Sequence, residues 1–434
     1  MVNILLVGND ARTHCVAEAI VSSPQKPVLF SYMKARNPGI AKLSKDVMIG
    51  AYDDLDGIKR YAKSIGADLA VIGPEDPLNK GVVDVLEDLA IPAVGPKKTL
   101  ARLETSKSFT RKLLEKYSIP GNPRFKVFET MDGIAEFLEE LGEFVIKPDG
   151  LTGGKGVKVF GDHIQSVAEG VSYCKEVLME HPLVVVEEKL DGEEFSLQSF
   201  CDGKNLLHTP PVQDHKRAFA DDLGPNTGGM GSYSTGKLLP FMTPEDLEEA
   251  ENITQMVCNA LAEETGQAYK GVMYGGFICT ASGVKLIEYN ARLGDPEAMN
   301  VLPVYKGDFV ELCKAITEGT LNGLQAEFSE ECTVCKYAVP QGYPANPAKG
   351  ARIDPGIAGE AKVYFASVEQ KGDGLHMTSS RALAFVGVAD TIDEAEQIAE
   401  KAVCSVDGPV SHREDIGTQR LLNRRIEHMK SLRK

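Results

Sequence analysis

Short apolar runs alternate with helical patterns near the start of the chain, and this alternation restricts the fold more than any other feature of the sequence. The helical patterns lie between apolar runs at residues 2–8, 26–32, 68–74 and 91–96. Strands that alternate with helices indicate a parallel, doubly wound sheet. The sequence therefore predicts an N-terminal α/β domain over residues 1–101.

The middle of the chain has a different pattern. One long helical pattern at 99–119 is expected to join two domains. Strand and helix patterns beyond it come in pairs that suit antiparallel hairpins, and an amphipathic helix at 245–266 precedes two strands within 271–294. These features predict an α+β region over residues 102–324, with a smaller lobe at about 122–192.

Two further segments complete the organisation. Residues 213–234 form a long stretch without a regular pattern, and we expect it to be functional because long loops inside compact domains usually are. From about residue 325 strand patterns dominate, followed by a helix at 393–404 and a polar tail. A small strand-rich C-terminal domain is therefore expected over 325–434.

Composition excludes several classes of protein. The net charge of -16 argues against a general nucleic-acid binder, which carries a basic face, but leaves room for a small phosphorylated ligand. Apolar runs fall short of the ~18 residues that cross a membrane. Nine scattered cysteines favour a reducing, cytoplasmic location, and Cys332-x-x-Cys335 reads as a strand rather than a zinc site because no second pair lies near.

A glycine-rich stretch, "IKPDGLTGGKGVKVF" at 146–160, lies between two strand patterns. A P-loop reads G-x-x-x-x-G-K-[ST] and opens a helix. Here the spacing from Gly150 to Gly154 is one residue too short, Gly156 replaces the hydroxyl residue, and a strand follows. The stretch is therefore either a different nucleotide-binding loop or a flexible hairpin turn.

Three lysines could converge on a nucleotide phosphate. Lys107 lies on the junction helix, Lys147 ends the strand before the glycines, and Lys155 lies among them. Each alone also fits a solvated surface lysine. Lys147 differs, because it follows the buried run "EFVI" and a charge that starts from a buried strand needs a partner.

Two acidic segments suggest further contacts. "LVVVEEKLDGEE" at 183–194 could offer backbone groups to a purine and a carboxylate to a ribose, or be a plain acidic hairpin. In "KLIEYNARLGDPE", Glu288 and Asn290 alternate on a strand, so both side chains point to one face. Their oxygens suit Mg²⁺, and Arg292 on the same face suits a phosphate, although an exposed strand face would look similar.

These elements occur in an order that resembles the ATP-grasp superfamily, in which two α+β lobes clamp ATP beneath a glycine-rich flap. Within it, the segments "GPEDPLNKGVVD", "QDHKR", "GPNTGGMGSYS" and "YNARLGDPE" resemble the motifs of the phosphoribosylamine–glycine ligase family. The resemblance covers nearly the whole chain. It implies a central ATP-grasp fold of two α+β lobes between the N-terminal parallel sheet and the strand-rich C-terminal domain.

The resemblance also implies a reaction. Members of this family of purine biosynthesis join glycine to 5-phosphoribosylamine and convert ATP to ADP and phosphate through a glycyl phosphate. The implied cofactors are ATP and Mg²⁺ or Mn²⁺. The implied partners are these small substrates, without nucleic acid or membrane, for a monomer that contacts the enzyme supplying phosphoribosylamine transiently.

Site residues follow from the same resemblance. Catalytic roles are implied for Arg292, Lys155 and Asp214. ATP contacts are implied for Lys107, Lys147, Gly153, Gly154, Lys155, Gly156, Glu187, Leu190 and Glu194, and metal ligation for Glu288 and Asn290. Substrate contacts are implied for Asn9, Arg12, Glu75, Lys80, Gly81, Asp214, Lys216, Arg217, Asn226, Gly228, Gly229, Asp295 and Pro296.

Two segments depart from the family pattern. The family usually shows G-N-G-G-R-E-H after the first strand, whereas this chain reads "GNDARTH" from Gly8 to His14. Asp10 adds a negative charge where a ribose phosphate is expected. The segment around Arg381 also lacks the family's usual Gly-Gly-Arg, although Arg381 itself could keep its role.

Three alternatives stay open at this point. Another ATP-grasp carboxylate–amine ligase or carboxylase would share residues 105–295 but should lack "QDHKR" and "GPNTGGMG". A dinucleotide oxidoreductase would need G-x-G-x-x-G after the first strand, which the chain lacks. A non-catalytic nucleotide-binding module is the third, and the presence of all the charged positions argues against it.

Overall fold

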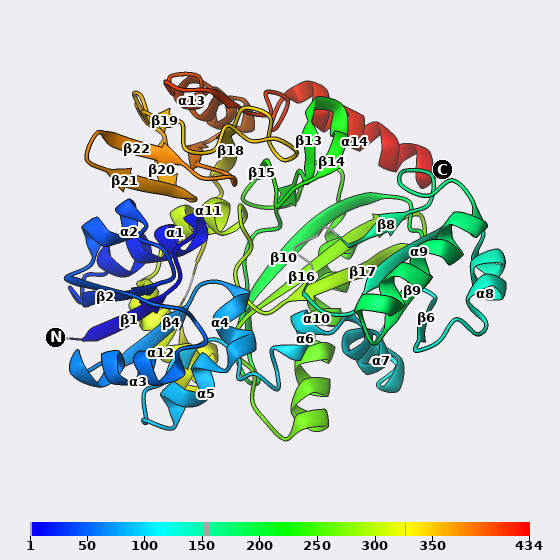
Figure 1. The fold of residues 1–434 in the computed structure, drawn as a ribbon, viewed down its shortest axis with the longest axis horizontal. Helices are drawn as coiled ribbons and strands as arrows, with labels where there is room; N and C mark the ends of the chain where they lie inside the picture. Colours follow the sequence, from blue (N-terminus) through cyan, green and yellow to red (C-terminus); the bar gives the residue numbers. More distant parts are fainter. Residues whose placement is uncertain (1, 152–155, 326) are drawn as a thin grey trace.

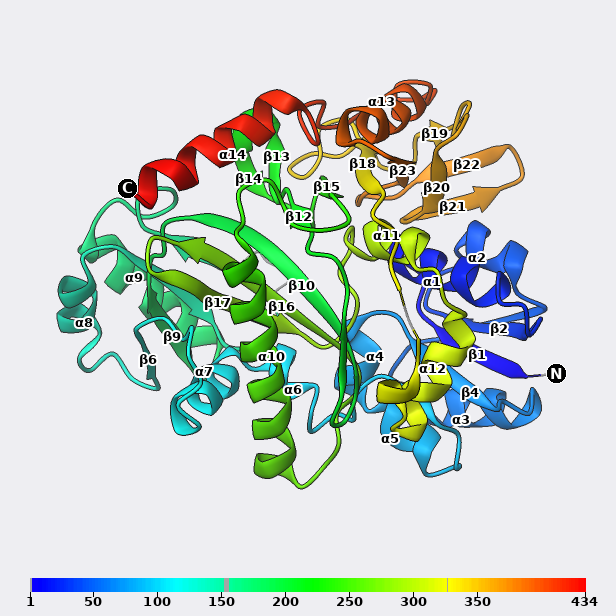
Figure 2. The same cartoon turned by 180° about the vertical axis from the view of Figure 1, so that it is seen from behind.

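The computed structural model describes residues 2–151, 156–325 and 327–434. The N-terminal domain and the strand-rich C-terminal region lie on one side of the molecule, and a small lobe lies on the other (Figures 1 and 2). Between them, long antiparallel strands form the centre of the structure (Figure 1). This arrangement confirms the predicted fold class.

The N-terminal sheet is parallel throughout, with the strand order β3-β2-β1-β4-β5. Its strands are β1 (Asn3–Val7), β2 (Val28–Met33), β3 (Asp46–Ile49), β4 (Leu69–Ile72) and β5 (Ala93–Val94). Its helices are α1 (Ala11–Val21), α2 (Pro38–Leu43), α3 (Leu55–Ser64), α4 (Glu75–Lys80) and α5 (Val82–Glu87). The sequence did not predict β3, because this edge strand is largely exposed and lacks an apolar run.

The predicted single helix at 99–119 is wrong. Two helices occupy the segment, α6 (Arg102–Thr105) and α7 (Lys107–Lys116). Ser106 separates them in an extended conformation, and its hydroxyl accepts a hydrogen bond from the backbone of Phe109, which caps α7. The break brings Ser106 and Ser108 onto the carboxylate of Asp149, next to the glycine-rich stretch.

A small lobe follows α7 and has its own apolar core. Its antiparallel sheet has the order β6-β9-β7-β8. The strands are β6 (Phe125–Phe128), β7 (Phe144–Pro148), β8 (Lys158–Val159) and β9 (Val184–Glu188), covered by α8 (Ile134–Leu141) and α9 (Val167–Glu180). The glycine-rich stretch therefore connects β7 to β8, two antiparallel neighbours, as the hairpin reading predicts.

The central antiparallel sheet has the order β11-β10-β16-β17 and carries the predicted metal-ligand strand. Its strands are β10 (Glu193–Asp202), β11 (Leu206–His208), β16 (Lys270–Thr280) and β17 (Gly283–Asn290). The associated helices are α10 (Pro244–Thr265), α11 (Ala298–Val301), α12 (Phe309–Glu318), and the short η2 (Leu302–Val304) and η3 (Leu321–Gly323).

Residues 213–234 are more regular than the sequence predicts. They contain β12 (Gln213–Asp214), β13 (Arg217–Phe219), η1 (Ala220–Asp222), β14 (Leu223–Asn226) and β15 (Gly231–Ser234). Strands β13 and β14 pair as a hairpin, whose short length and exposed tip leave little apolar pattern to read.

The C-terminal region confirms the strand-rich prediction, and the polar tail proves to contain a helix that the sequence did not predict. Its strands are β18 (Cys332–Pro340), β19 (Arg352–Ile353), β20 (Lys362–Phe365), β21 (Val368–Lys371), β22 (Gly374–Met377), β23 (Leu383–Ala389) and β24 (Val410–Ser411). Helix α13 (Ile392–Val403) matches the predicted helix, and the tail forms α14 (Gln419–Leu432). Helix α14 buries Leu421, Leu422 and Met429, and its arginines pair with Asp221 and Asp222.

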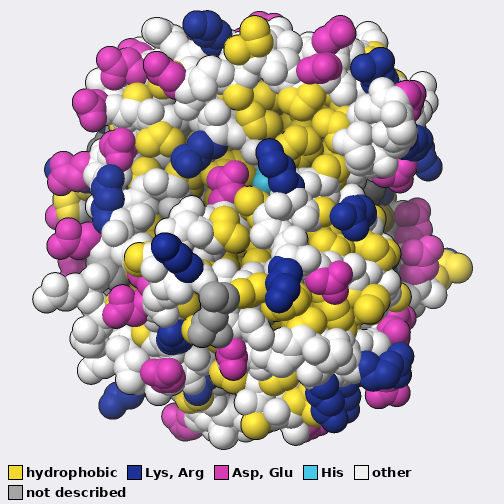
Figure 3. Space-filling view, turned by 90° about the vertical axis from the view of Figure 1, so that its left-hand side faces the viewer, with side chains coloured by type: hydrophobic (Ala, Val, Ile, Leu, Met, Phe, Trp, Pro, Cys, Tyr) yellow, Lys and Arg dark blue, Asp and Glu magenta, His cyan; other side chains and the backbone are white. Residues whose placement is uncertain are grey.

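The surface mixes charges of both signs. Figure 3 shows basic and acidic side chains interspersed over the face at the N-terminal side of the molecule. Across the three described segments, none of the helices combines the length and apolar character needed to cross a bilayer.

Candidate active site

A fully buried charge cluster lies where the small lobe meets the central sheet. The carboxylate of Glu187 accepts two hydrogen bonds from Arg111, at 2.7 and 2.9 Å, and lies 2.7 Å from the Lys147 ammonium. Burial opposes ionisation of Glu187, but Arg111 and Lys147 together lower its pKa to about 2. Two cations thus share the carboxylate of Glu187, and the carboxylate of Glu288 also acts on Lys147.

The metal-ligand strand is tied to this cluster through its backbone. A register shift between β16 and β17 leaves Ile287 outside the ladder. Its carbonyl accepts hydrogen bonds from Arg111 at 2.7 Å and from Lys147 at 3.2 Å. The cluster therefore fixes the strand segment that precedes Glu288.

Glu288 and Asn290 lie on the same face of β17, as predicted. Burial raises the pKa of Glu288, but Lys216, Lys147 and Lys107 outweigh it and hold the pKa below its usual value. An ionised carboxylate beside an amide oxygen is a donor set that suits a hard divalent cation. The residues present therefore fit Mg²⁺ or Mn²⁺.

Arg292 joins this strand to the N-terminal domain. Its guanidinium lies 3.2 Å from Glu75, 2.9 Å from Glu104 and 3.2 Å from the side-chain oxygen of Asn290. Burial opposes the charge, but Glu104 and Glu75 raise the pKa of Arg292. Arg12 also lies 3.6 Å from Glu75, so the N-terminal domain contributes directly to this end of the sheet.

Nearby lie two carboxylates, of Asp214 and Glu297, that have no paired cation within the described part of the chain. Burial and the charge of Glu297 raise the pKa of Asp214 well above its usual range. Glu297 is almost fully buried and accepts a hydrogen bond of 2.7 Å from the Tyr274 hydroxyl. Next to them, Lys216 lies 3.2 Å from Glu194, and this carboxylate raises the pKa of the lysine.

Arg381 connects the loop after β14 to the segment after β17. Its guanidinium donates to the carbonyls of Gly228 at 2.7 Å, Gly229 at 3.0 Å and Asp295 at 3.1 Å. It also lies over the Tyr337 ring. Gly229 has a φ of +105°, and a Cβ there would lie 2.6 Å from Asp214 and 2.7 Å from Pro296, so this close approach requires glycine.

The altered turn after β1 is occupied by its own side chains. Asp10 caps α1 by accepting from the backbone of Thr13 at 2.8 Å and pairs with Arg12 at 2.5 Å. Asn9 accepts from the Tyr52 hydroxyl at 2.7 Å. The Nδ1 atom of His14 accepts from the backbone of Phe365 at 2.9 Å, and burial lowers the pKa of His14 to about 4.

Other predicted residues lie at the margins of the site. Lys107 donates to the carbonyl of Gly150 at 2.8 Å, and the carbonyl of Gly156 accepts from Tyr173. Arg217 pairs with Asp162 of the small lobe. The remaining margin positions are half-buried Leu190, Asn226 opposite Arg217 in the β13–β14 hairpin, exposed Lys80, and Gly81 at the end of α4.

Lys155, Gly153 and Gly154 lie outside the described residues, so their predicted roles stay predictions. The other assigned roles and the domain boundaries also stay predictions, because the positions of these residues in the structure do not test them. Sequence reasoning missed Arg111, Glu104 and Glu297. Arg111 and Glu104 lie in an ordinary helical pattern without a local signal, whereas Glu297 ends the quoted motif "YNARLGDPE".

Comparisons with known proteins agree along the whole chain. Three domain profiles of phosphoribosylglycinamide synthetase match: the N domain at 2–104, the ATP-grasp (A) domain at 105–298 and the C domain at 333–419. The phosphoribosylamine–glycine ligase of Methanosarcina acetivorans is 50% identical over 99% of this chain and 98% of its own. That of Methanopyrus kandleri is 46% identical over 100% of both chains.

Solved structures give the same result. The crystal structure of phosphoribosylamine–glycine ligase from Thermotoga maritima superposes with a TM-score of 0.80 and 27% identity, over 96% of this chain and 100% of that chain. The biotin carboxylase domain of Hydrogenobacter thermophilus 2-oxoglutarate carboxylase has a TM-score of 0.72 over 99% of this chain and 93% of that chain. At 15% identity, it shares the fold alone.

The fold and the charged site together define an ATP-dependent ligase of the ATP-grasp class. Within that class, the chain belongs to the phosphoribosylglycinamide synthetase family.

Proposed function

We propose that the protein ligates glycine to 5-phosphoribosylamine, forming glycinamide ribonucleotide, ADP and phosphate in purine biosynthesis. The observation that carries the proposal is the convergence on β17. There Lys147, Lys216 and Arg292 surround Glu288 and Asn290, in a chain similar to ligases of this name along its full length. Cations beside a metal-binding carboxylate suit a nucleotide triphosphate.

The nucleotide would lie between the small lobe and the central sheet. The two cations that share Glu187, together with the Mg²⁺ or Mn²⁺ that Glu288 would hold, favour a phosphate beside Lys147. Lys107 and the glycine-rich stretch with Lys155 would add contacts from above. The backbone of Glu187 and Leu190 would meet adenine, and Glu194 would accept the ribose hydroxyls, as the family resemblance implies.

Glu288 and Asn290 would hold Mg²⁺ or Mn²⁺. When bound, the ion would neutralise negative charge on the phosphates and orient the phosphoryl group that is transferred. Arg292 would lie beside the same phosphate, because it already contacts Asn290. Its pairing with Glu75 and Glu104 keeps the guanidinium fixed before substrate arrives.

The chemistry needs no protein nucleophile. An oxygen of the glycine carboxylate would attack the γ-phosphorus of ATP, and the bond to the β,γ-bridging oxygen would break, which gives glycyl phosphate and ADP. The nitrogen of phosphoribosylamine would then attack the acyl carbon, and phosphate would leave as the nitrogen loses a proton. The protein supplies positioning, charge and exclusion of water.

Asp214 and Glu297 would bind an amino group of the substrates. Their carboxylates lack a paired cation among the described residues, and a substrate ammonium beside them would favour the ionised form of Asp214, whose pKa burial and Glu297 raise. Arg12, Asn9 and Glu75 would contact the phosphoribosyl group from the N-terminal domain, with Lys80 and Gly81 near it.

The test is ADP release with each substrate omitted in turn. Release that requires both glycine and phosphoribosylamine supports the proposal. Release with bicarbonate or another carboxylate in place of glycine would favour a different ATP-grasp ligase or carboxylase. ATP binding without turnover would favour a nucleotide-binding module.

We further propose that the protein acts as a monomer in the cytoplasm and meets the enzyme that supplies phosphoribosylamine only transiently. Light scattering at working concentration tests the monomer, and a concentration-dependent dimer would contradict it. Crosslinking during turnover tests the transient contact.

A further inference from the structure

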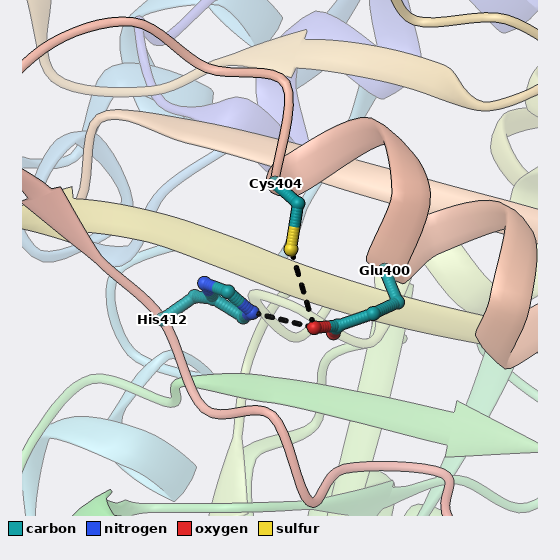
Figure 4. A group of neighbouring side chains, drawn as sticks. All are labelled: Glu400, Cys404 and His412. Atoms are coloured by element: carbon teal, nitrogen blue, oxygen red, sulfur yellow. Dashed lines mark hydrogen bonds and ion pairs between the residues drawn. The ribbon is translucent and has the colours of Figure 1, made fainter.

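A second cluster of ionisable side chains lies apart from the active site, at the end of α13. Glu400 and Cys404 lie one helical turn apart, and His412 follows strand β24. Figure 4 shows the three side chains pointing toward one another. One oxygen of Glu400, Oε1, lies 3.0 Å from His412 Nε2 and 3.4 Å from Cys404 Sγ.

We propose that Glu400, Cys404 and His412 bind a zinc ion. Zinc takes oxygen and nitrogen ligands at about 2.0 Å and sulfur at about 2.3 Å, so tetrahedral neighbours lie about 3.3 Å (O to N) and about 3.5 Å (O to S) apart. The two separations in the structure are 3.0 and 3.4 Å, and all three ligand atoms lie within 4.8 Å of one another. Small movements of the three side chains would therefore place their ligand atoms at three of the four positions of a tetrahedral zinc site.

The other carboxylate oxygen of Glu400 is already fixed by a neighbour. Lys336, on β18, is fully buried and donates to Glu400 Oε2 at 2.5 Å, to Glu396 at 2.6 Å and to the carbonyl of Glu414 at 2.9 Å. Hydrogen bonds of this kind orient the ligands of metal sites. They leave Oε1 as the oxygen that faces Cys404 and His412.

Charge balance favours a divalent cation. Glu396 balances the positive charge of the Lys336 ammonium, so the negative charge of Glu400 remains unbalanced. Zinc binding would displace the proton of the Cys404 thiol to solvent as the zinc–sulfur bond forms. Carboxylate, thiolate and neutral imidazole then cancel the charge of Zn²⁺, so binding should strengthen as pH rises.

The ligand types select the metal. A sulfur, a nitrogen and one oxygen suit zinc, whereas Mg²⁺ prefers oxygen ligands alone. Cys404 is exposed, so the fourth position is open to water. Because Arg413 follows His412 and pairs with Asp222 of η1, a bound ion would also steady the segment that holds the β13–β14 hairpin.

Cobalt titration of the chelator-treated, full-length protein tests the proposal, with Mg²⁺ present to fill the active site. Cobalt substitutes for zinc and gives a charge-transfer absorption when a thiolate binds it. Cys404 is the exposed cysteine, and the other eight are buried, so the band reports this site. We expect one equivalent of Co²⁺ to produce the band and one equivalent of Zn²⁺ to remove it.

Variants make the test specific. Cys404→Ser and His412→Gln should lose the band, and both change partly exposed side chains, so the fold can be checked by circular dichroism. Glu427→Gln is the control, because exposed Glu427 on α14 pairs with Lys430 and lies outside both the ligand set and the Lys336 cluster, and it should keep the band. A wild-type protein without the band, or a band that survives in Cys404→Ser, would overturn the proposal.

Discussion

Two buried lysines, Lys147 and Lys336, show how one residue type serves opposite purposes. Each extends from a strand and is held by carboxylates. Around Lys147, Arg111 is a second cation and Glu187 is the one carboxylate in direct contact with both, so positive charge is in excess among the paired groups. Around Lys336, Glu396 and Glu400 are two carboxylates for one cation, so negative charge is in excess.

The sign of the excess charge in each cluster indicates the charge of the ligand that binds there. Burying unbalanced charge is unfavourable, so such a cluster persists where a ligand of opposite sign offsets it. The excess at Lys147 faces the expected phosphates, and the excess at Lys336 faces the Cys404 and His412 side chains.

Glu187→Gln should damage the Lys147 cluster most. It leaves two buried cations without their carboxylate, so we expect the free energy of unfolding to fall by about 3–5 kcal/mol. Urea denaturation measures the change. Glu188→Gln is the control, because that neighbouring carboxylate is more exposed, and it should cost less than about 1 kcal/mol. Equal losses in both variants would contradict the comparison.

Glu288→Ala should remove the proposed metal ligand without disturbing the Arg111–Glu187–Lys147 cluster. Turnover, measured as ADP release, should fall at least about 100-fold, since losing an outer-shell partner alone costs about 10–100-fold. Glu263→Gln, an exposed carboxylate on α10, should retain full turnover. Unaltered turnover in Glu288→Ala would remove the metal assignment.

Lys147→Met should abolish the positive excess while keeping the Arg111–Glu187 pair. Loss of one charge-assisted contact to phosphate costs about 1.5–3 kcal/mol, so the KM for ATP should rise about 10–100-fold. Lys126→Met on the exposed face of β6 should leave it unchanged. If the KM for ATP is the same in both variants, the excess charge does not bind nucleotide.

The acid sensitivity of Glu400 should be the smallest effect. Burial opposes ionisation of Glu400, but hydrogen bonds from His412 and Lys336 lower its pKa from 4.5 to about 2. A depressed pKa contributes stability above the unfolded pKa, which is lost as pH falls from about 4.5 towards about 2.

Without metal, the free energy of unfolding of Glu400→Gln should therefore fall by about 1 kcal/mol less than that of the wild type over this pH range. Urea denaturation at several pH values measures this difference. Parallel pH profiles in the two proteins would show that the Lys336 cluster does not hold Glu400 ionised.

Much of this organisation could be predicted from the sequence. The alternation of strands and helices gave the N-terminal sheet, and Lys147 was expected to need a partner because it ends a buried strand. Which partner could not be predicted. Glu187 is separated from Arg111 by 76 residues, and nothing near either residue indicates their contact.

The missed elements share a physical cause. Strand β3 is an exposed edge, and α14 buries Leu421, Leu422 and Met429 within a segment that is otherwise mostly polar. The single helix predicted at 99–119 ignored the capping hydroxyl of Ser106, whose local signal is short. Long-range contacts and local caps thus determine secondary structure that hydrophobic periodicity alone does not predict.

The bond from Arg12 to the carbonyl of Leu293, at 2.8 Å, joins residues 281 positions apart. At about 5–20 residues per second, a ribosome needs roughly 15–60 s to synthesise that interval. The N-terminal sheet can fold early, but Arg12 must wait for its acceptor. During synthesis, the end of the site that contains Arg12 is therefore among the last parts of the molecule to form its native contacts.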